Sequence, residues 1–264
     1  MVVNWNTSSE AIQAARGYAA SDAVTTRVLV FDNDSLPEQV EILRSAAGDD
    51  FELIESDRNI GFGAAVNYAL KEGRGEYVVV SNADVAPDPD ALWKMVRVAD
   101  ENPDAGMVGP VFVGRSNDYH DHIPGPLTLL IRTLVGGFGR VAIDLPGVDE
   151  VARVGQPSGA CFLMRRDVWA DVGGFDDSFY LWYEDVDLAR RLRDRGMTGF
   201  VVGGARVQHI GGESFALLSN ADKQRIRLES LGHYLALHHP RARVLARPLL
   251  WLSSVLRVGR ASEK

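Results

Sequence analysis

The chain has 264 residues, of which 28 are basic and 36 acidic, so its formal net charge is −8. The length suits one large α/β domain or two small ones. Its 46% apolar content excludes a disordered chain, and its single cysteine, Cys161, excludes a disulfide scaffold. No apolar run reaches the roughly 18–20 residues that a membrane-spanning helix needs, and no secretory signal is visible at the start. An acidic chain without a basic stripe also argues against nucleic acid as a partner.

The charge is uneven along the chain. From Lys223 onward nine basic residues face only two acidic ones, a net charge of +7, whereas the residues before Lys223 carry −15. We therefore divide the chain into a body, residues 1–215, and a basic, partly apolar tail, residues 216–264. Arginines and leucines around Trp251 are typical of a helix that lies in a membrane interface. A C-terminal helix packed on the body explains them equally well.

Short apolar, β-branched segments alternate with segments of helical spacing over the body. In chain order, strands are predicted at 2–3, 28–31, 51–54, 77–80, 107–113, 161–164 and 200–207, and helices at about 9–20, 36–47, 61–71, 88–99 and 184–196. This alternation predicts a mostly parallel sheet with right-handed crossovers, flanked by helices. Residues 114–157 are rich in Gly and Pro and show little periodicity, which predicts a long loop or a lid.

Polar residues directly follow three of the predicted strands. Asn4 follows the first, Asp32 follows 28–31, and Asn82 and Asp84 follow 77–80. Parallel strands end at one edge of a sheet, which is where ligands bind. Helix capping or a turn explains any one of these clusters, but three at corresponding positions predict a binding site. The turn from Asn59 to residue 63 has two glycines before a helix, which suits a phosphate, although alone it is mostly turn chemistry.

A second polar cluster joins acids to aromatic residues. Glu184, Asp185 and Asp187 begin a predicted helix, and aromatic residues occupy positions 179, 180, 182 and 183 just before them. Capping alone explains acids at a helix start, whereas the aromatic residues suit a sugar ring whose hydroxyls face a carboxylate base. His209 follows the last predicted strand beside two glycines, and such a histidine is either a structural residue or a metal ligand.

Taken together, these segments resemble glycosyltransferase family 2, and within it the bacterial rhamnosyltransferase-like members. The matches occur in the same order over about residues 1–215 and comprise Val2–Asn6, Phe31–Ser35, Asn59–Asn67, Asn82–Asp84 and Gly173–Leu188. The resemblance implies a GT-A fold, a nucleotide-sugar donor such as dTDP-rhamnose or a UDP-sugar, a divalent metal, and inversion at the anomeric carbon. Family members usually carry a few more apolar residues in the first strand than the three found here, so we expect an internal start or a trimmed chain.

The resemblance also implies roles for single residues around the donor. Asn4 would lie at the edge of the nucleobase, and Asp32 would hydrogen-bond the base or its neighbourhood. Asn59 and Gly61 would line the donor pocket near the diphosphate and the sugar. Asn82 occupies the first acidic position of the family's Asp-x-Asp motif, a replacement that is common in the rhamnosyltransferase-like branch.

Metal and base are implied in the same way. Asp84 would be the main protein ligand of Mg²⁺ or Mn²⁺, with most other ligands supplied by diphosphate and water. His209 matches a family position that approaches the metal or the diphosphate. Asp185, the second acid of the pair with Glu184, matches the catalytic base. In this scheme the metal neutralises the leaving diphosphate, and Asp185 takes the proton of the attacking hydroxyl.

The expected function is therefore an inverting glycosyltransferase of cell-envelope polysaccharide synthesis, acting on a saccharide or polyprenyl-linked acceptor. We expect it in the cytoplasm, with a peripheral contact of the tail to the inner face of the cell membrane as one of the two interpretations above. Two alternatives compete. A sugar-1-phosphate nucleotidyltransferase relies on a glycine-rich, basic signature, and none follows the first strand here. A non-catalytic nucleotide-sugar-binding module would not need both Asp84 and Asp185.

Overall fold

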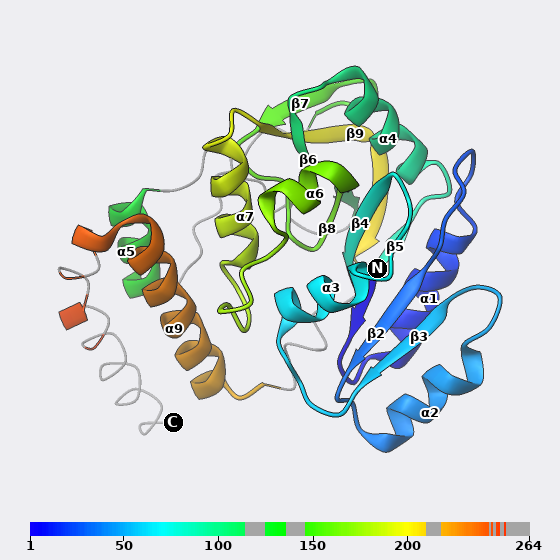
Figure 1. The fold of residues 1–264 in the computed structure, drawn as a ribbon, viewed down its shortest axis with the longest axis horizontal. Coiled ribbons are helices and arrows are strands. Elements are labelled where there is room, and N and C mark those ends of the chain that lie inside the picture. Colours follow the sequence, from blue (N-terminus) through cyan, green and yellow to red (C-terminus); the bar gives the residue numbers. More distant parts are fainter. Residues whose placement is uncertain are drawn as a thin grey trace.

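A central sheet with helices on both faces forms the body of the protein (Figure 1). The computed structural model describes residues 1–113, 125–135, 146–209, 218–242, 244, 247–248 and 251. Within them the strand order is β3-β2-β1-β4-β8-β6-β9-β5, and β7 pairs with β9. The strands are β1 (Val2–Asn4), β2 (Leu29–Asn33), β3 (Glu52–Ser56), β4 (Tyr77–Asn82), β5 (Val85–Pro87), β6 (Ala105–Val113), β7 (Val151–Val154), β8 (Cys161–Arg165) and β9 (Thr198–His209).

The first part of the chain builds the parallel part of the sheet, as predicted. β1 pairs in parallel with β2 and β4, with Val3 opposite Phe31 and Val2 opposite Ser81, and β2 pairs in parallel with β3. β2 is buried along its whole length, which explains its continuous apolar start. The carboxyl ends of β1, β2 and β4 therefore lie at one edge of the sheet. The crossovers carry α1 (Ser8–Ala19), α2 (Pro37–Ala46) and α3 (Phe62–Leu70).

The second part of the chain departs from the parallel pattern. β8 inserts antiparallel between β4 and β6, so that Leu163 lies opposite both Val79 and Val108. β5 and β7 run antiparallel to β9. The helix predicted from residue 88 begins later, as α4 (Ala91–Glu101), because Asp88 N still donates to Arg206 O of β9 over 3.0 Å. The direction of these strands depends on partners far away in the sequence, which local apolar runs do not specify.

The prediction of a loop over residues 114–157 is wrong in the described parts. Helix α5 (Pro126–Val135) lies there, and so does β7, whose Val151 pairs with Val202. α5 begins with a proline, which a first helical turn tolerates well, and its Leu129 is buried. Pro126 at the start of α5 and Gly147 and Gly155 on either side of β7 account for the Pro and Gly near these two elements. Residues 114–124 and 136–145 lie outside the described residues, so the lid stays a prediction.

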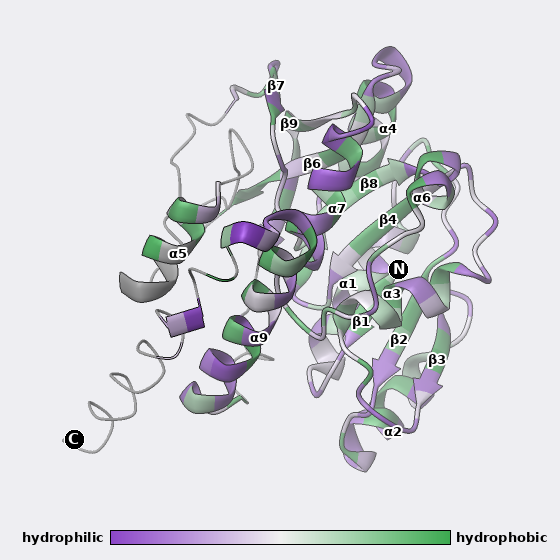
Figure 2. Ribbon diagram, turned by 60° about the vertical axis from the view of Figure 1, so that its left-hand side comes forward, coloured by the Kyte–Doolittle hydropathy of each residue, from purple (hydrophilic) through white to green (hydrophobic). Residues whose placement is uncertain are grey.

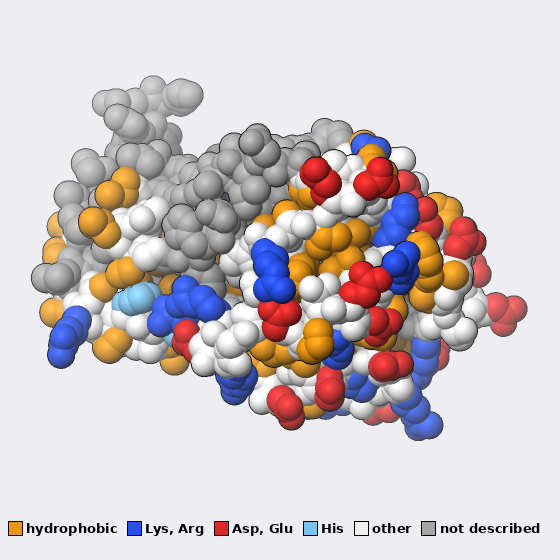
Figure 3. Space-filling view, turned by 90° about the horizontal axis from the view of Figure 1, so that it is seen from above, with side chains coloured by type: hydrophobic (Ala, Val, Ile, Leu, Met, Phe, Trp, Pro, Cys, Tyr) orange, Lys and Arg blue, Asp and Glu red, His pale blue; other side chains and the backbone are white. Residues whose placement is uncertain are grey.

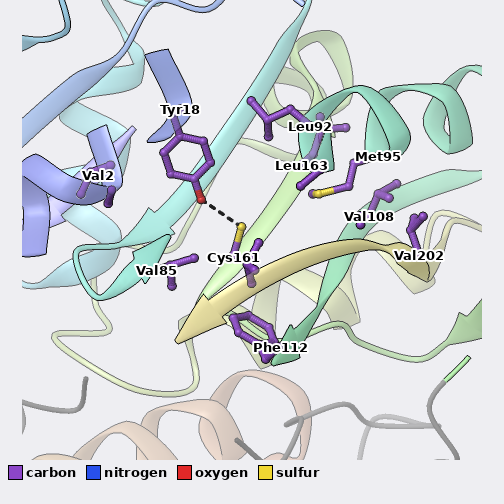
Figure 4. Close-up of a cluster of buried hydrophobic side chains, with 14 of the residues drawn as sticks. Val2, Tyr18, Val85, Leu92, Met95, Val108, Phe112, Cys161, Leu163 and Val202 are labelled. Atoms are coloured by element: carbon purple, nitrogen blue, oxygen red, sulfur yellow. Dashed lines mark hydrogen bonds between the residues drawn. The ribbon is translucent and has the colours of Figure 1, made fainter. Parts of the chain in front are cut away.

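Two hydrophobic clusters hold the layers together. The central strands β4 and β8, which contribute to both, are coloured mostly hydrophobic in Figure 2. The first cluster packs α1 and α4 against the sheet and contains Cys161, which is buried as expected, with its Sγ 3.2 Å from Tyr18 Oη (Figure 4). The second contains side chains of α3, α6 (Arg166–Val172), α7 (Glu184–Arg193) and α9 (Asn220–His238). α9 belongs to the tail and buries Leu231, Tyr234 and Leu235 in this cluster. None of the described helices is long and apolar enough to cross a membrane.

Candidate active site

A pocket opens at the edge of the sheet where β1, β2 and β4 end. Four of the residues predicted around the donor lie in its wall, namely Asn59, Gly61, Asn82 and Asp84. The pocket thus occupies the position at which open α/β sheets bind ligands. The rest of the wall comes from Val3, Trp5, Asn33, Phe62, Ala83, Tyr180, Leu181 and Leu218.

Asn4 and Asp32 lie directly behind this wall. They are 0% and 1% exposed, and Asn4 Nδ2 donates to Asp32 Oδ1 over 2.8 Å. The other carboxylate oxygen of Asp32 accepts from the Ser35 backbone N–H over 3.1 Å. A buried network of this kind holds its members in one geometry. It therefore fixes the ends of β1 and β2. Trp5, which follows β1, and Asn33, the last residue of β2, both line the pocket.

Asn33 is a pocket residue that the sequence analysis missed. Its Nδ2 donates to Asn59 Oδ1 (3.1 Å) and to Gly61 O (3.2 Å), so it fixes the turn before α3. Gly61 has φ +87°, and a Cβ on it would lie 2.5 Å from Tyr180 O. Only glycine meets both requirements, and the turn therefore brings the aromatic segment onto the pocket. The signal available in the sequence was the place of Asn33 directly after Asp32, at a strand end.

Asp84 stands at the corner between β4 and β5, beside the end of β9. Val85, which follows it, lies opposite His209 in the antiparallel pairing of β5 with β9. The backbone thus brings both predicted metal ligands to one place, while the His209 side chain lies outside the described residues. In the described part of the chain, no group of three or more His, Cys, Asp or Glu side chains could hold a metal ion. One carboxylate suits Mg²⁺ or Mn²⁺ where a diphosphate and water supply further oxygens.

The predicted base, Asp185, lies beside the same edge of the sheet. A side chain on Gly159 would collide with its carboxylate. The next residue, Ala160, accepts a backbone hydrogen bond from Asn82 N over 2.9 Å. Through residues 159–160 the carboxylate of Asp185 is therefore connected to the pocket wall at Asn82, two positions from Asp84. Asp185 Oδ1 also accepts from the N–H of the following residue over 2.8 Å, which orients it at the start of α7.

Glu184 differs from its neighbour because it is almost fully enclosed. It is 7% exposed, it packs near Gly63 of α3, and its Oε2 has no hydrogen-bond partner among the described residues. Burial first, and then the nearby charge of Asp185, raise the pKa of Glu184 to about 8. At neutral pH Glu184 is therefore mostly protonated, which limits the negative charge beside Asp185.

The aromatic segment reaches α7 through two residues in the left-handed region. Trp182 has φ 65°, and Tyr183, which precedes the first helical residue, has φ 71°. Such a conformation costs a non-glycine residue about 1–3 kcal/mol. Tyr183 is buried against Tyr234 of α9, with 5.8 Å between ring centroids. Of the four aromatic residues that the sequence analysis singled out, Tyr180 lies in the described pocket wall, so the sugar platform is narrower than expected.

The third acid of the cluster, Asp187, serves the packing of two helices. It is buried, with an Arg191 guanidinium nitrogen 2.7 Å from Oδ2 and His238 Nε2 2.7 Å from Oδ1. His238 belongs to α9, and Ser230 of the same helix donates to Leu181 O over 2.8 Å. α9 thus holds the segment before the acids and the first turn of α7 at once. No pattern in the sequence predicted this contact between the tail and the acid cluster.

The chain matches a known family and several curated relatives. The model of the family described as Glycosyltransferase like family 2 matches residues 1–228. N-acetylglucosaminyl-diphospho-decaprenol L-rhamnosyltransferase of Mycobacterium tuberculosis is 29% identical over 177 residues, which cover 60% of this chain and 58% of that protein. Rhamnosyltransferase WbbL of Escherichia coli K12 is 24% identical over 181 residues, covering 65% and 67%. The chain therefore spans little more than half the length of the mycobacterial relative.

Solved structures share the fold at low identity. The mannosyltransferase PcManGT of Pyrobaculum calidifontis, in complex with GDP-Man and Mn²⁺, matches 99% of this chain and 78% of its own, with a TM-score of 0.57 at 17% identity. TarS 1–349 of S. aureus in complex with UDP matches 89% and 71%, with a TM-score of 0.54 at 17% identity. These likenesses concern the fold alone, and they confirm the GT-A architecture expected from the sequence.

Proposed function

Because the chain belongs to the family described as Glycosyltransferase like family 2, we propose that it transfers a sugar from a nucleoside-diphosphate donor to a hydroxyl group of a cell-envelope glycan or its lipid-linked precursor. One observation carries this proposal: two carboxyl groups approach the same edge of the sheet. Asp84 lies in the pocket wall, and Asp185 connects to that wall through residues 159–160. A donor whose diphosphate lies at Asp84 would present its sugar toward Asp185.

Asp185 is the general base of a single displacement. The acceptor oxygen forms a bond to the anomeric carbon, the bond from that carbon to the donor diphosphate breaks, and Asp185 takes the proton of the acceptor hydroxyl. The anomeric configuration inverts because the attack comes from the face opposite the leaving group. General-base help of this kind is worth roughly 10²–10⁴ in rate. A protonated Glu184 supports this role, since it adds no second charge beside Asp185 at neutral pH.

Asp84, with His209 at the end of β9, would hold Mg²⁺ or Mn²⁺ together with the donor diphosphate. Bound there, the cation would supply neutralisation of the charge that grows on the leaving diphosphate. Support comes from the carboxylate in the pocket wall and from the register that sets Val85 opposite His209.

In the donor pocket, we assign one group of residues to the diphosphate and sugar and a second group to the nucleobase. Asn59, Gly61 and Asn82 would contact the diphosphate and the sugar, while Asn4 and Asp32 would shape the base site from behind. Rhamnose is the sugar we favour, because both relatives named above are rhamnosyltransferases. A lipid-linked acceptor, as the name of the mycobacterial relative indicates, would place the reaction at the inner face of the cell membrane.

A donor panel tests the proposal. The chain is mixed with dTDP-rhamnose, a UDP-sugar or GDP-mannose, each with Mn²⁺ and an N-acetylglucosaminyl-diphospho-lipid, and released nucleoside diphosphate is measured. Thermal shift reports binding without turnover. We expect dTDP-rhamnose to stabilise the chain and to release dTDP only when acceptor is present. Binding of a donor without any release would indicate a binding module, and pyrophosphate release from a nucleoside triphosphate would indicate a nucleotidyltransferase. Either result contradicts the proposal.

The Asp84→Ala variant tests the metal. Loss of the only carboxylate in the described pocket wall should lower turnover by roughly 10²–10³-fold, as removal of one stabiliser of a leaving anion does. Excess EDTA should lower wild-type turnover similarly, and added Mn²⁺ should restore it. Asp49→Ala, at an exposed position far from the pocket, is the matched control. Full activity in excess EDTA would contradict the metal role of Asp84.

A further inference from the structure

The end of the molecule formed by α5 and α9 carries exposed apolar side chains that the proposed chemistry does not use. Leu127 and Ile131 of α5 are 70% and 51% exposed, and Leu237 near the end of α9 is 47% exposed. Leu127 and Ile131 stand four residues apart and share one face of α5, while Leu129 points inward and is buried. α5 and α9 contact each other and lie side by side in Figures 1 and 2.

The charge at this end is positive. Arg241 and Arg247 are exposed, and so are Val244 and Trp251 further along the tail. The sequence has no Asp or Glu from residue 230 to residue 262, and none within α5. In Figure 3 hydrophobic side chains show at the left end, which α5 and α9 occupy in Figure 1, whereas most of the visible acidic side chains lie in the other half. Basic side chains occur over the whole visible face, but a net positive charge lies at this end of an otherwise acidic protein.

We propose that this surface, defined by Leu127, Ile131, Leu237 and Arg241 and continued by the exposed tail residues, docks on an anionic lipid membrane. Exposed aliphatic side chains beside arginine and tryptophan are the arrangement of helices that insert shallowly into a bilayer and are held by anionic headgroups. A second copy of this chain, paired through the same surface, would bring the arginines of both copies into one interface, and neither α5 nor residues 230–262 offer an acid to pair with them, so like charges disfavour this pairing. The membrane is thus the occupant that matches both the apolar and the cationic part.

Docking there would also orient the active site. α9 carries part of the docking surface, and the same helix holds the acid cluster through Ser230 and Leu181 and through His238 and Asp187. Docking would therefore hold the acid cluster at a fixed position relative to a bilayer that carries the acceptor, a consequence that rests on the proposed function. The docking itself does not. The sequence had suggested a membrane contact for the tail alone. The structure adds α5, a helix that the sequence did not predict, as a second element of the docking surface.

Vesicle flotation of the full chain tests the docking surface. We expect the chain to float with vesicles of equal parts phosphatidylglycerol and phosphatidylcholine, and roughly tenfold less with phosphatidylcholine alone. The double variant L127S/I131S should lower binding to the anionic vesicles by roughly tenfold or more, since two inserting side chains are lost. The matched control is L36S/I42S, which changes two exposed aliphatic residues at α2, at the far end of the molecule.

Three outcomes would overturn the inference. One is equal flotation of L127S/I131S and wild type, provided that both melt at the same temperature. The second is an R241E/R247E variant that binds the anionic vesicles as well as wild type does. The third is a dimer in light scattering that L127S/I131S dissociates, which would assign the surface to a second copy. With a water-soluble acceptor, L127S/I131S should release nucleoside diphosphate like wild type, so a failure of docking is distinguishable from a failure of the proposed function.

Discussion

Two buried carboxyl groups near the pocket, those of Asp32 and Glu184, are held in opposite ways. Asp32 is 1% exposed, and its two oxygens accept hydrogen bonds from Asn4 Nδ2 and Ser35 N. Glu184 is enclosed as well, but its Oε2 has no partner in the described part of the chain, and its neighbour Asp185 is another acid. The protein itself supplies hydrogen-bond donors to Asp32, whereas burial beside the like charge of Asp185 favours the protonated form of Glu184.

The difference indicates that Asp32 stabilises the fold, whereas we expect the start of α7 to take part in the reaction. The hydrogen-bonding capacity of Asp32 is used to fix strand ends, so removing it should affect stability more than turnover. At the start of α7 one buried atom, Glu184 Oε2, has no hydrogen-bond partner among the described residues, and the next residue, Asp185, is the proposed base. Variants at Asp32 should therefore lower mainly the free energy of unfolding, and variants at the start of α7 should change mainly turnover or its dependence on pH.

Asp185→Asn has the largest expected effect. The amide keeps the shape of the side chain but cannot accept a proton, so turnover should fall by roughly 10²–10⁴-fold. Donor binding, measured by thermal shift, should stay within about twofold, because the base contacts the acceptor side. Asp171→Asn, at an exposed position on α6, is the control. Normal turnover in Asp185→Asn would remove this residue from the role of base.

Glu184→Gln should change the pH dependence of stability. The pKa of Glu184 is about 8 in the folded protein, against an ordinary 4.5, so between these values the folded state holds a proton that the unfolded state has released. The free energy of unfolding should therefore fall as pH rises from about 4.5 to about 8. Glutamine carries no titratable proton and should remove this fall, leaving the variant about 2–4 kcal/mol more stable than wild type at the upper end.

Urea unfolding at several pH values measures this difference. Curves of wild type and Glu184→Gln that run parallel across the whole range would show that Glu184 titrates normally. A variant that is less stable at every pH would show that the carboxyl group has a partner which the amide cannot replace.

Asp32→Asn should lower the free energy of unfolding by about 1–3 kcal/mol, because the amide group leaves a buried donor facing other donors. Turnover per folded molecule should change much less than in Asp185→Asn. Asp34→Asn, at an exposed position two residues on, is the control for stability. A variant of normal stability that has changed its preference among nucleotide bases would instead place Asp32 in direct contact with the donor.

His238→Ala should have the smallest effect, a loss of about 1 kcal/mol, because Asp187 keeps its contact with Arg191. The loosened contact between α9 and α7 should lower kcat severalfold and leave KM for the donor unchanged. His238→Gln keeps a polar group near Asp187 and should recover part of the loss. An unchanged kcat in His238→Ala would limit the role of this contact to packing.

The sequence was informative where structure is local. Continuous apolar runs such as Leu29–Phe31, followed at once by polar residues, predicted the parallel strands and the edge at which they end. Four residues expected around the donor do lie in one pocket, although their roles stay predictions. The antiparallel insertion of β8 could not be predicted in this way, because an apolar strand carries no mark of direction.

Long-range contacts explain the other gaps. The raised pKa of Glu184 results from its burial and from the nearby Asp185. The burial depends on contact between α7 and α3, which lie about 120 positions apart in the sequence. The contact between Asp187 and His238 joins α7 to α9, about 50 positions downstream. Side chains that meet only after the sheet has formed leave no periodicity in the chain.

The left-handed backbone at Trp182 and Tyr183 places a conformational cost on two neighbouring codons. Glycine or asparagine would adopt this positive φ at little cost, but Tyr183 is 2% exposed, and losing its buried ring costs about 3–5 kcal/mol, more than the strain relieved. The same substitutions would remove a ring that packs on Tyr234 and would loosen the acids that follow. Directed evolution for higher thermal stability should therefore leave both codons unchanged and vary other positions.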